Sequence, residues 1–328
     1  MAEIADAAGV SVPTVSRVVN GRGEVSPATR RRVEFLLHQH GYLKRTTTGR
    51  ASALLELVFN DFDSPWSVEI IRGVESVLRP AGFGTVVSAV HHAAASADAV
   101  IADIRARASA GVVLVTSDVD PPMHEQLLQL NVPTVVVDPA GVPSLQIPTV
   151  GATNWAGGMA ATEHLLALGH RRIAIVTGPL RFLCSRARFD GHRAALESAG
   201  LTADPALTRE GTFYSESGFL AAEQLLSLPA RPTAIVAGSD QMAFGVSEAA
   251  RRGGLRVPDD LSVVGFDDLP ESRWSSPPLT TVRQPLADMG AHAARIVLDL
   301  VAGTPVTSPR IELATSLVVR ESTASPAG

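Results

Sequence analysis

The sequence has few of the residues that build disulfide scaffolds, structural zinc sites and membrane spans. It holds one cysteine, Cys184, in 328 residues, which excludes a disulfide framework and a multi-cysteine zinc site. No apolar run approaches the roughly 18 residues that a membrane span needs. The first residues carry Glu3 and Asp6 and lack the basic and apolar regions of a secretory signal. We therefore expect a cytoplasmic protein with no membrane partner.

Sequence signatures of nucleotide-dependent enzymes are missing as well. The chain has neither a phosphate-binding loop nor a strand-linked G-x-G-x-x-G motif. Cys184 has no obvious catalytic histidine partner, so a small buried residue is the simpler interpretation. The adjacent His91 and His92 are more simply solvated than metal-binding. We expect no catalytic residues, no metal and no cofactor, and hence a protein that is not an enzyme.

The charge that is present is unevenly distributed. Residues 1–50 hold eight Arg or Lys and four acids, a net charge of +4. Because the whole chain carries −5, the remainder carries −9. With 45% hydrophobic and 19% charged residues, the chain has an ordinary globular composition and room for two or three domains. A small basic head on a larger acidic body is typical of a tethered DNA-binding module, although a short segment can also differ by chance.

Helical signals fill the basic head. Ile4, Ala5 and Ala8 share one helix face, and Gly9 ends that helix. Ser11 is placed as the N-cap of a second helix over residues 12–19. Ser26-Pro27 opens a third. The pattern predicts an all-α helix-turn-helix unit.

The second helix has the side chains of a major-groove reader. Its N-terminal positions would reach base edges, and an arginine there can pair bidentately with guanine. We expect base contacts from Val12, Pro13, Ser16 and Arg17, and phosphate contacts from Ser11, Thr14 and Asn20. A plain three-helix subdomain with a solvated Arg17 is the alternative.

The rest of the chain alternates short apolar runs with helical stretches, which predicts an α/β body with parallel sheets covered on both faces. The number of strands indicates two lobes. The expected strands are 54–59, 84–90, 112–115, 134–137, 173–176, 234–237 and 262–266. The expected helices are 67–78, 99–108, 124–130, 156–168, 187–199, 218–226 and 242–252.

Acidic side chains follow several of these strands. Ligands of open α/β sheets bind beyond the carboxyl ends of the strands, and carboxylates together with an arginine suit vicinal hydroxyls. This pattern indicates a carbohydrate site. Capping of the following helix is the alternative for each single acid. The polar residues after the strands include Asp61, Ser64, Asp138, Arg188, Asp240, Asp267 and Asp268.

Several motifs resemble the lactose-repressor (LacI/GalR) family of bacterial transcription regulators. Residues 4–21 (IADAAGVSVPTVSRVVNG) resemble the family's DNA-binding head. Residues 151–158 (GATNWAGG), 238–245 (GSDQMAFG) and 263–268 (VVGFDD) resemble its periplasmic-binding-protein-like core. The resemblance implies a head over residues 1–45, a linker over 46–53 that is about four residues shorter than usual, a two-lobed body over 54–321 and a flexible tail over 322–328. Lobe 1 would comprise about 54–152 and 285–314, and lobe 2 about 153–284 and 315–321.

The resemblance also implies a function and a ligand site. It implies a regulator, most simply a repressor, whose homodimer binds a pseudo-palindromic double-stranded DNA operator and responds to a small molecule such as a sugar. Without the leucine-rich C-terminal helix of some relatives, we expect a dimer. A purine or nucleoside effector, or a sugar-binding protein without a DNA function, are the alternatives. Ser239 replaces the family's usual asparagine. The implied effector contacts are Ser64, Trp66, Asp138, Arg188, Phe213, Asp240 and Asp267.

Overall fold

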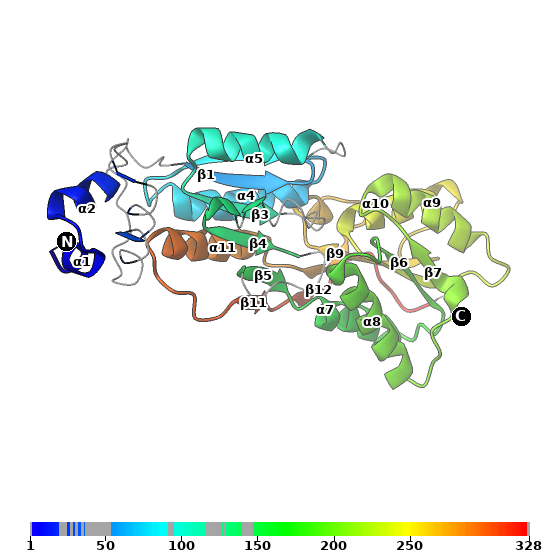
Figure 1. The fold of residues 1–328 in the computed structure, drawn as a ribbon. Coiled ribbons are helices and arrows are strands. Elements are labelled where there is room, and N and C mark those ends of the chain that lie inside the picture. Colours follow the sequence, from blue (N-terminus) through cyan, green and yellow to red (C-terminus); the bar gives the residue numbers. More distant parts are fainter. Residues whose placement is uncertain are drawn as a thin grey trace. The chain divides into compact units, whose positions relative to one another are not determined.

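The computed structural model divides the chain into two compact units, residues 1–53 and 54–328 (Figure 1). It describes residues 2–19, 25–26, 29, 32–33, 36, 54–90, 95–115, 126–127, 129–139 and 147–326. The expected linker over 46–53 lies outside the described residues, as do Asn20, His91 and His92.

The N-terminal unit contains two described helices, α1 (Ala2–Ala8) and α2 (Val12–Val19). Ile4, Val15 and Val18 are fully buried against one another and pack with Val33. Ser11 accepts a hydrogen bond from the backbone N–H of Thr14, as an N-cap residue does. The predicted helix starts and the apolar faces of both helices are present in the structure.

The body contains two six-stranded sheets, one in each lobe. The sheet of lobe 1 has the order β11-β5-β4-β3-β1-β2 and that of lobe 2 the order β12-β10-β9-β8-β6-β7. All described pairings are parallel except that of β12 with β10. The expected two-lobed α/β architecture with mainly parallel sheets is therefore confirmed. The strands of lobe 1 are β1 (Leu54–Phe59), β2 (Gly84–Ala89), β3 (Gly111–Val115), β4 (Thr134–Val137), β5 (Thr149–Ala152) and β11 (Arg310–Leu313). Those of lobe 2 are β6 (Ile173–Thr177), β7 (Thr208–Glu210), β8 (Ala234–Ala237), β9 (Ser262–Asp267), β10 (Thr280–Arg283) and β12 (Ser316–Val318).

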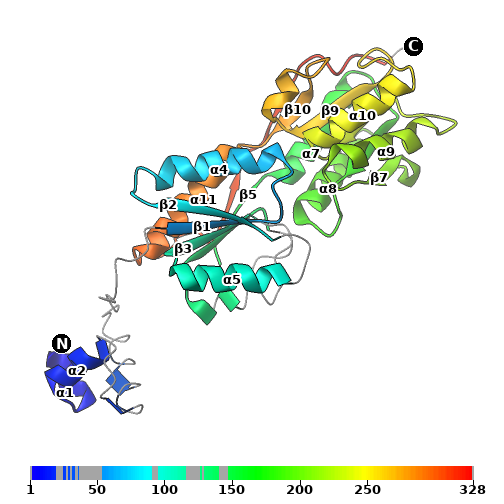
Figure 2. The same cartoon turned by 90° about the horizontal axis from the view of Figure 1, so that it is seen from above.

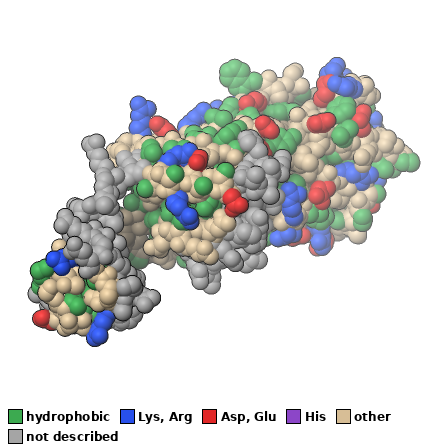
Figure 3. Space-filling view, turned by 45° about the horizontal axis from the view of Figure 1, so that its top comes forward, with side chains coloured by type: hydrophobic (Ala, Val, Ile, Leu, Met, Phe, Trp, Pro, Cys, Tyr) green, Lys and Arg blue, Asp and Glu red, His purple; other side chains and the backbone are tan. Residues whose placement is uncertain are grey.

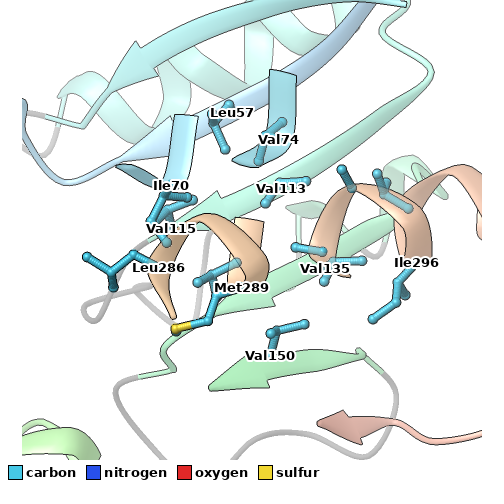
Figure 4. Packing of buried hydrophobic residues seen from close by; sticks show 14 of the residues in the cluster. Leu57, Ile70, Val74, Val113, Val115, Val135, Val150, Leu286, Met289 and Ile296 are labelled. Atoms are coloured by element: carbon cyan, nitrogen blue, oxygen red, sulfur yellow. The ribbon is translucent and has the colours of Figure 1, made fainter. Parts of the chain in front are cut away.

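The central strands are apolar along their length because both faces of each sheet are buried. In β3, Val113 and Val115 belong to one hydrophobic cluster, whereas Val112 and Leu114 belong to the cluster on the opposite face. Helices α4 (Pro65–Leu78) and α11 (Leu286–Val301) cover the first face and α5 (Ala95–Arg107) the second (Figure 2). Figure 4 shows Ile70 and Met289 packed together over this sheet.

Lobe 2 repeats this layering with other helices. They are α7 (Asn154–Ala167), α8 (Leu183–Ser198), α9 (Ser215–Leu226) and α10 (Asp240–Arg252). Helices α7 and α8 approach so closely that a Cβ on Gly158 would lie 2.1 Å from the carbonyl oxygen of Arg188. Helix α8 begins four residues before its predicted start, which places Cys184 and Arg188 on one helix face.

The chain passes between the sheets three times, after β5, after β10 and after β11. The segment after β12 differs from the flexible tail that we expected. Ser322 is 1% exposed, accepts a hydrogen bond from the N–H of Thr280 and donates one to Val263. His170 contacts the carbonyl oxygen of Ala324 at 2.9 Å. Residues 322–324 are thus held along lobe 2, because their polar groups are paired with β9, β10 and His170.

Candidate functional site

One face of α2 is the exposed part of the DNA-binding candidate. Val12 and Pro13 in the first turn and Arg17 in the last turn are exposed, while Val15 and Val18 are buried on the opposite face. The hydroxyl groups of Ser11 and Thr14 lie 2.9 Å apart and hydrogen-bond to each other. The helix therefore presents one cation and two apolar side chains outward on a face that its own core leaves uncovered.

A second candidate site lies where the carboxyl ends of the two sheets face each other. Asp138 follows β4, Phe213 precedes α9 and Asp267 ends β9. All three have positive φ angles, of 52°, 74° and 121°. A side chain at positive φ costs on the order of 1–3 kcal/mol and persists only where its surroundings enforce it, often at a binding site. We call this group, with Arg188, Cys184 and Gln284, the interlobe cluster.

Arg188 is the cation at the centre of the interlobe cluster. It is 5% exposed, and it donates to Asn154 Oδ1 at 2.8 Å and to the carbonyl oxygen of Gly238 at 2.5 Å. Its guanidinium carbon lies 3.9 Å from the ring centre of Phe266 and 5.9 Å from that of Phe213. These contacts fix the plane of the guanidinium and hold a buried positive charge between carboxyl groups.

Burial dominates the titration of those carboxyl groups. It raises the pKa of Asp138, and the charge of Arg188 opposes the rise. Burial likewise raises the pKa of Asp267 to about 7, against Arg188 and a hydrogen bond that Gln284 donates at 2.7 Å. The pKa of Asp240 is raised well above its usual value by burial and by the nearby Asp267. A carboxyl group that keeps its proton can donate to a ligand hydroxyl as well as accept from it.

Asp138 belongs to lobe 1, yet its side chain meets lobe 2. The thiol of Cys184 interacts with the Asp138 carboxyl group, which lowers the pKa of Asp138 and raises that of the thiol. Burial and the Asp138 charge raise the pKa of this thiol to about 12. Cys184 is buried, as expected, but its position in the cluster was not predicted.

The other predicted effector residues also stabilise local structure. Ser64 accepts from the N–H of Trp66 and caps α4, while Trp66 packs against the core of lobe 1. Asp240 is fully buried and accepts from the Thr281 hydroxyl and from the N–H of Leu269 at 2.7 Å. These contacts agree with the alternative of structural acids and caps, and they leave an effector role for these three residues a prediction.

Sequence reasoning missed several residues that build the cluster. Asn154 and Gln284 orient Arg188 and Asp267, and Ser239 donates to the carbonyl oxygen of Phe213 at 2.7 Å. Among the buried side chains that the structure describes, Ser185 Oγ and Gln284 Oε1 have no hydrogen-bond partner. Such atoms are expected to meet a ligand or water. Ser185 lies in the first turn of α8 and Gln284 directly follows β10, so no local pattern marks them.

A separate groove of about 890 Å³ lies on lobe 2, between α10 and the segment after β9. Phe244 and Leu255 line it, with Glu248 and Arg251 among the charged residues. The side chain of Trp274, also in the lining, is 84% exposed. A large exposed aromatic residue beside an apolar groove indicates a protein contact surface.

Over the part of the chain that the structure describes, no group of three or more His, Cys, Asp or Glu side chains could hold a metal ion. None of its helices combines the length and the apolar character needed to cross a bilayer.

Known proteins similar to this chain share both parts of this arrangement. Residues 1–44 match the family model of bacterial regulatory proteins of the lacI family, and residues 162–323 match that of the periplasmic binding protein-like domain. The transcriptional regulator CelR of Thermobifida fusca is 35% identical, over 97% of this chain and 96% of that protein.

Two solved structures extend the comparison to three dimensions. A complex of the regulator CelR with cellobiose has a TM-score of 0.78 at 35% identity and covers 97% of this chain and 98% of that one. A lac repressor dimer bound to operator and an anti-inducer has a TM-score of 0.74 at 31% identity, with 98% of each chain covered. The chain belongs to the LacI family of bacterial transcription regulators.

Proposed function

We propose that this chain is a repressor whose homodimer binds a pseudo-palindromic DNA operator and whose affinity for that operator depends on a small effector, a sugar. The observation that carries the proposal is the interlobe cluster, in which buried carboxyl groups at strained backbone positions surround Arg188. Such a regulator acts on the chromosome and therefore in the cytoplasm. An effector changes DNA affinity only through its different affinity for two states of the body, and about 1–3 kcal/mol of coupling gives roughly 5–150-fold regulation.

The exposed face of α2 supports DNA reading. Arg17 can pair with guanine and Val12 can contact a thymine methyl group. Over the visible face of the body, acidic and basic side chains are interspersed (Figure 3), so the charge of the head is the better match to DNA. The relative bound to operator supports the same assignment.

A mobility-shift titration with DNA from upstream of the gene tests this role. Arg17→Ala should lose about 5–150-fold in preference for the operator over random DNA. Arg32→Ala, an exposed arginine of the same unit, should weaken binding to both DNAs alike if it contacts phosphates. Equal loss on both DNAs for Arg17→Ala would contradict base reading.

The acids and Arg188 support a polyhydroxyl effector, and a relative binds cellobiose. Cellobiose, other neutral sugars and nucleosides can be screened by the melting temperature of the full chain. A ligand at 100 times its Kd stabilises the folded state by about 2.7 kcal/mol. We expect stabilisation by a sugar that Asp267→Asn weakens. Stabilisation by nucleosides alone would favour the nucleoside-responsive alternative.

The groove with Trp274 supports a homodimer, since a second copy would cover an exposed aromatic ring beside apolar walls. A relative is a dimer on its operator. Sedimentation of the full chain should give a dimer, and Trp274→Glu should shift it toward monomer. Leu220→Glu, which changes an exposed residue of α9 outside the groove lining, is the matched control. A dimer unaffected by Trp274→Glu would place the interface elsewhere.

A further inference from the structure

A hydrogen bond between two side chains joins the lobes outside the interlobe cluster. The hydroxyl group of Tyr214, just before α9 in lobe 2, donates to Asp61 Oδ1 in lobe 1 at 2.7 Å. The two residues are 153 positions apart in the sequence. Neither the strand crossings nor the packed helices of one lobe enforce this contact, so it forms only while the lobes are together.

Both partners are held in place by their own lobe. Asp61 lies just beyond the carboxyl end of β1, and the same Oδ1 accepts the N–H of Asp63 at 3.1 Å. The carbonyl oxygen of Tyr214 accepts from Ser217, whose Oγ accepts from the N–H of Thr212. Phe213, directly before it, is fixed by Ser239. Each side of the contact is therefore prepared before the lobes meet.

The chemistry of the pair suits a contact between a hydroxyl donor and an ionised acceptor. Half-burial and the charge of Asp61 raise the pKa of Tyr214, which keeps the phenol protonated and able to donate. Hydrogen bonds to an ionised acceptor are about twice as strong as neutral ones. Because neither residue belongs to the interlobe cluster, a ligand bound in that cluster need not break the hydrogen bond between Tyr214 and Asp61.

We propose that Tyr214 and Asp61 form a latch between the lobes that sets the fraction of molecules in the closed arrangement. Only the effect of the latch on effector affinity rests on the proposed effector role of the interlobe cluster. For a ligand that needs the closed arrangement, the apparent Kd equals the intrinsic Kd divided by the closed fraction. The latch therefore changes effector affinity without contacting the effector.

Hydrogen exchange of the full chain, without effector or DNA, tests the latch directly. Each variant is read on the lobe that does not carry the substitution. For Tyr214→Phe, the amides of Asp63 and Trp66 in lobe 1 should exchange about tenfold faster. For Asp61→Ala, the amides of Gly211 and Thr212 in lobe 2 should do the same. Tenfold corresponds to about 1.4 kcal/mol.

Two controls make the result decisive. Asp63→Asn removes an exposed charge from the same loop and should leave the lobe 2 amides unchanged. The double variant Tyr214→Phe with Asp61→Ala is read on the amides of Trp66 and Gly211, which donate to Ser64 and Thr177 and not to either substituted side chain. These amides should exchange no faster than in the single variants, because one bond is lost once.

Two outcomes would overturn the proposal. One is unchanged exchange in the opposite lobe. The other is an equal acceleration at Leu57 and Ile175 in the sheets, which would mean that the hydroxyl stabilises the chain as a whole. Since neither ligand nor DNA is present, this test can fail while the proposed regulator function stands, and the reverse also holds.

Discussion

The two lobes have the same strand order but differ in how they provide the edge at which they meet. Lobe 2 provides Arg188, Phe213 and Asp267, each held by side chains of its own lobe or by the crossing after β10. Lobe 1 provides Asp138 and Asp61, which reach across to Cys184 and Tyr214. With the same strand order, lobe 2 holds a polar network within itself, whereas lobe 1 provides acids whose partners lie in lobe 2.

This difference indicates that the two lobes have different roles in ligand binding. Polar groups already fixed in their hydrogen bonds can receive a ligand with little further ordering. If the cluster binds the proposed effector, we expect lobe 2 to hold it first and lobe 1 to close upon it. Substitutions that disturb lobe 2 should change stability and binding together, whereas matched substitutions in lobe 1 should separate them.

The largest expected effect comes from removing the buried cation. Arg188→Ala leaves Asp138 and Asp267 buried without a positive charge and leaves Asn154 Oδ1 without its donor. Breaking a buried pair in this way typically costs about 3–5 kcal/mol. Denaturant unfolding of the full chain, monitored by circular dichroism, measures the loss.

Arg193 provides a matched control on the same helix. It is about half exposed and forms surface ion pairs with Asp190 and Glu197. Such pairs contribute about 0–1 kcal/mol, so Arg193→Ala should be nearly neutral. Similar losses for the two arginines would mean that lobe 2 has no prebuilt network.

The next effect compares a tight helix contact in each lobe. A Cβ on Gly158 would lie 2.1 Å from the carbonyl oxygen of Arg188, and one on Gly73 would lie 1.9 Å from that of Ala287. Gly158→Ala and Gly73→Ala must each push two helices apart, at a cost of about 1–3 kcal/mol.

Of these two contacts, only that of Gly158 involves the backbone of Arg188. Calorimetric titration with a sugar that stabilises the wild type should therefore show weaker binding for Gly158→Ala and near-normal binding for Gly73→Ala. Gly151→Ala meets no atom within 4 Å and controls for the methyl group. Equal binding losses for Gly73→Ala and Gly158→Ala would remove the distinction between the lobes.

The fold could be predicted where consecutive apolar residues indicate a buried element. Strands such as β3 carry an uninterrupted apolar run because both faces are covered. Strand β10 was missed because Thr280 and Thr281 are fully buried polar residues whose partners are distant in the sequence. Helix α11 was also missed, although Leu286, Met289 and Ala293 recur at helical spacing.

The site could be predicted only in part, for a related reason. Acids after strands indicated the correct edge of each sheet, since strand ends are local features. The contacts that orient them join residues 17 to 153 positions apart. No spacing rule covers such pairs, so Asn154, Gln284 and Tyr214 emerged only from the three-dimensional arrangement.

The pH dependence of stability tests the buried acids of the interlobe cluster. A carboxyl whose folded pKa is raised stabilises the protein below its unfolded pKa, near 3.9, and loses that contribution as pH rises through its folded pKa, about 7 for Asp267. Between pH 4 and 7 the wild type should lose up to about 1.4 kcal/mol per pH unit relative to Asp267→Asn. Unfolding midpoints across this range measure the slope. Asp190→Asn, at an exposed site, should follow the wild type, and parallel curves for Asp267→Asn and wild type would contradict the raised pKa.

The smallest expected effect compares the same helix cap in the two lobes. Ser64 caps α4 of lobe 1 and Ser239 caps α10 of lobe 2, each through its side-chain oxygen. Ser64→Ala should cost about 1 kcal/mol. Ser239→Ala should cost about 1 kcal/mol more, because Ser239 also donates to the carbonyl oxygen of Phe213. Melting temperatures of the body should therefore fall by roughly 2–4 °C for each kcal/mol. Identical shifts for both variants would mean that the strained backbone at Phe213 is held by other contacts, and that lobe 2 owes less of its order to side-chain hydrogen bonds than its geometry indicates.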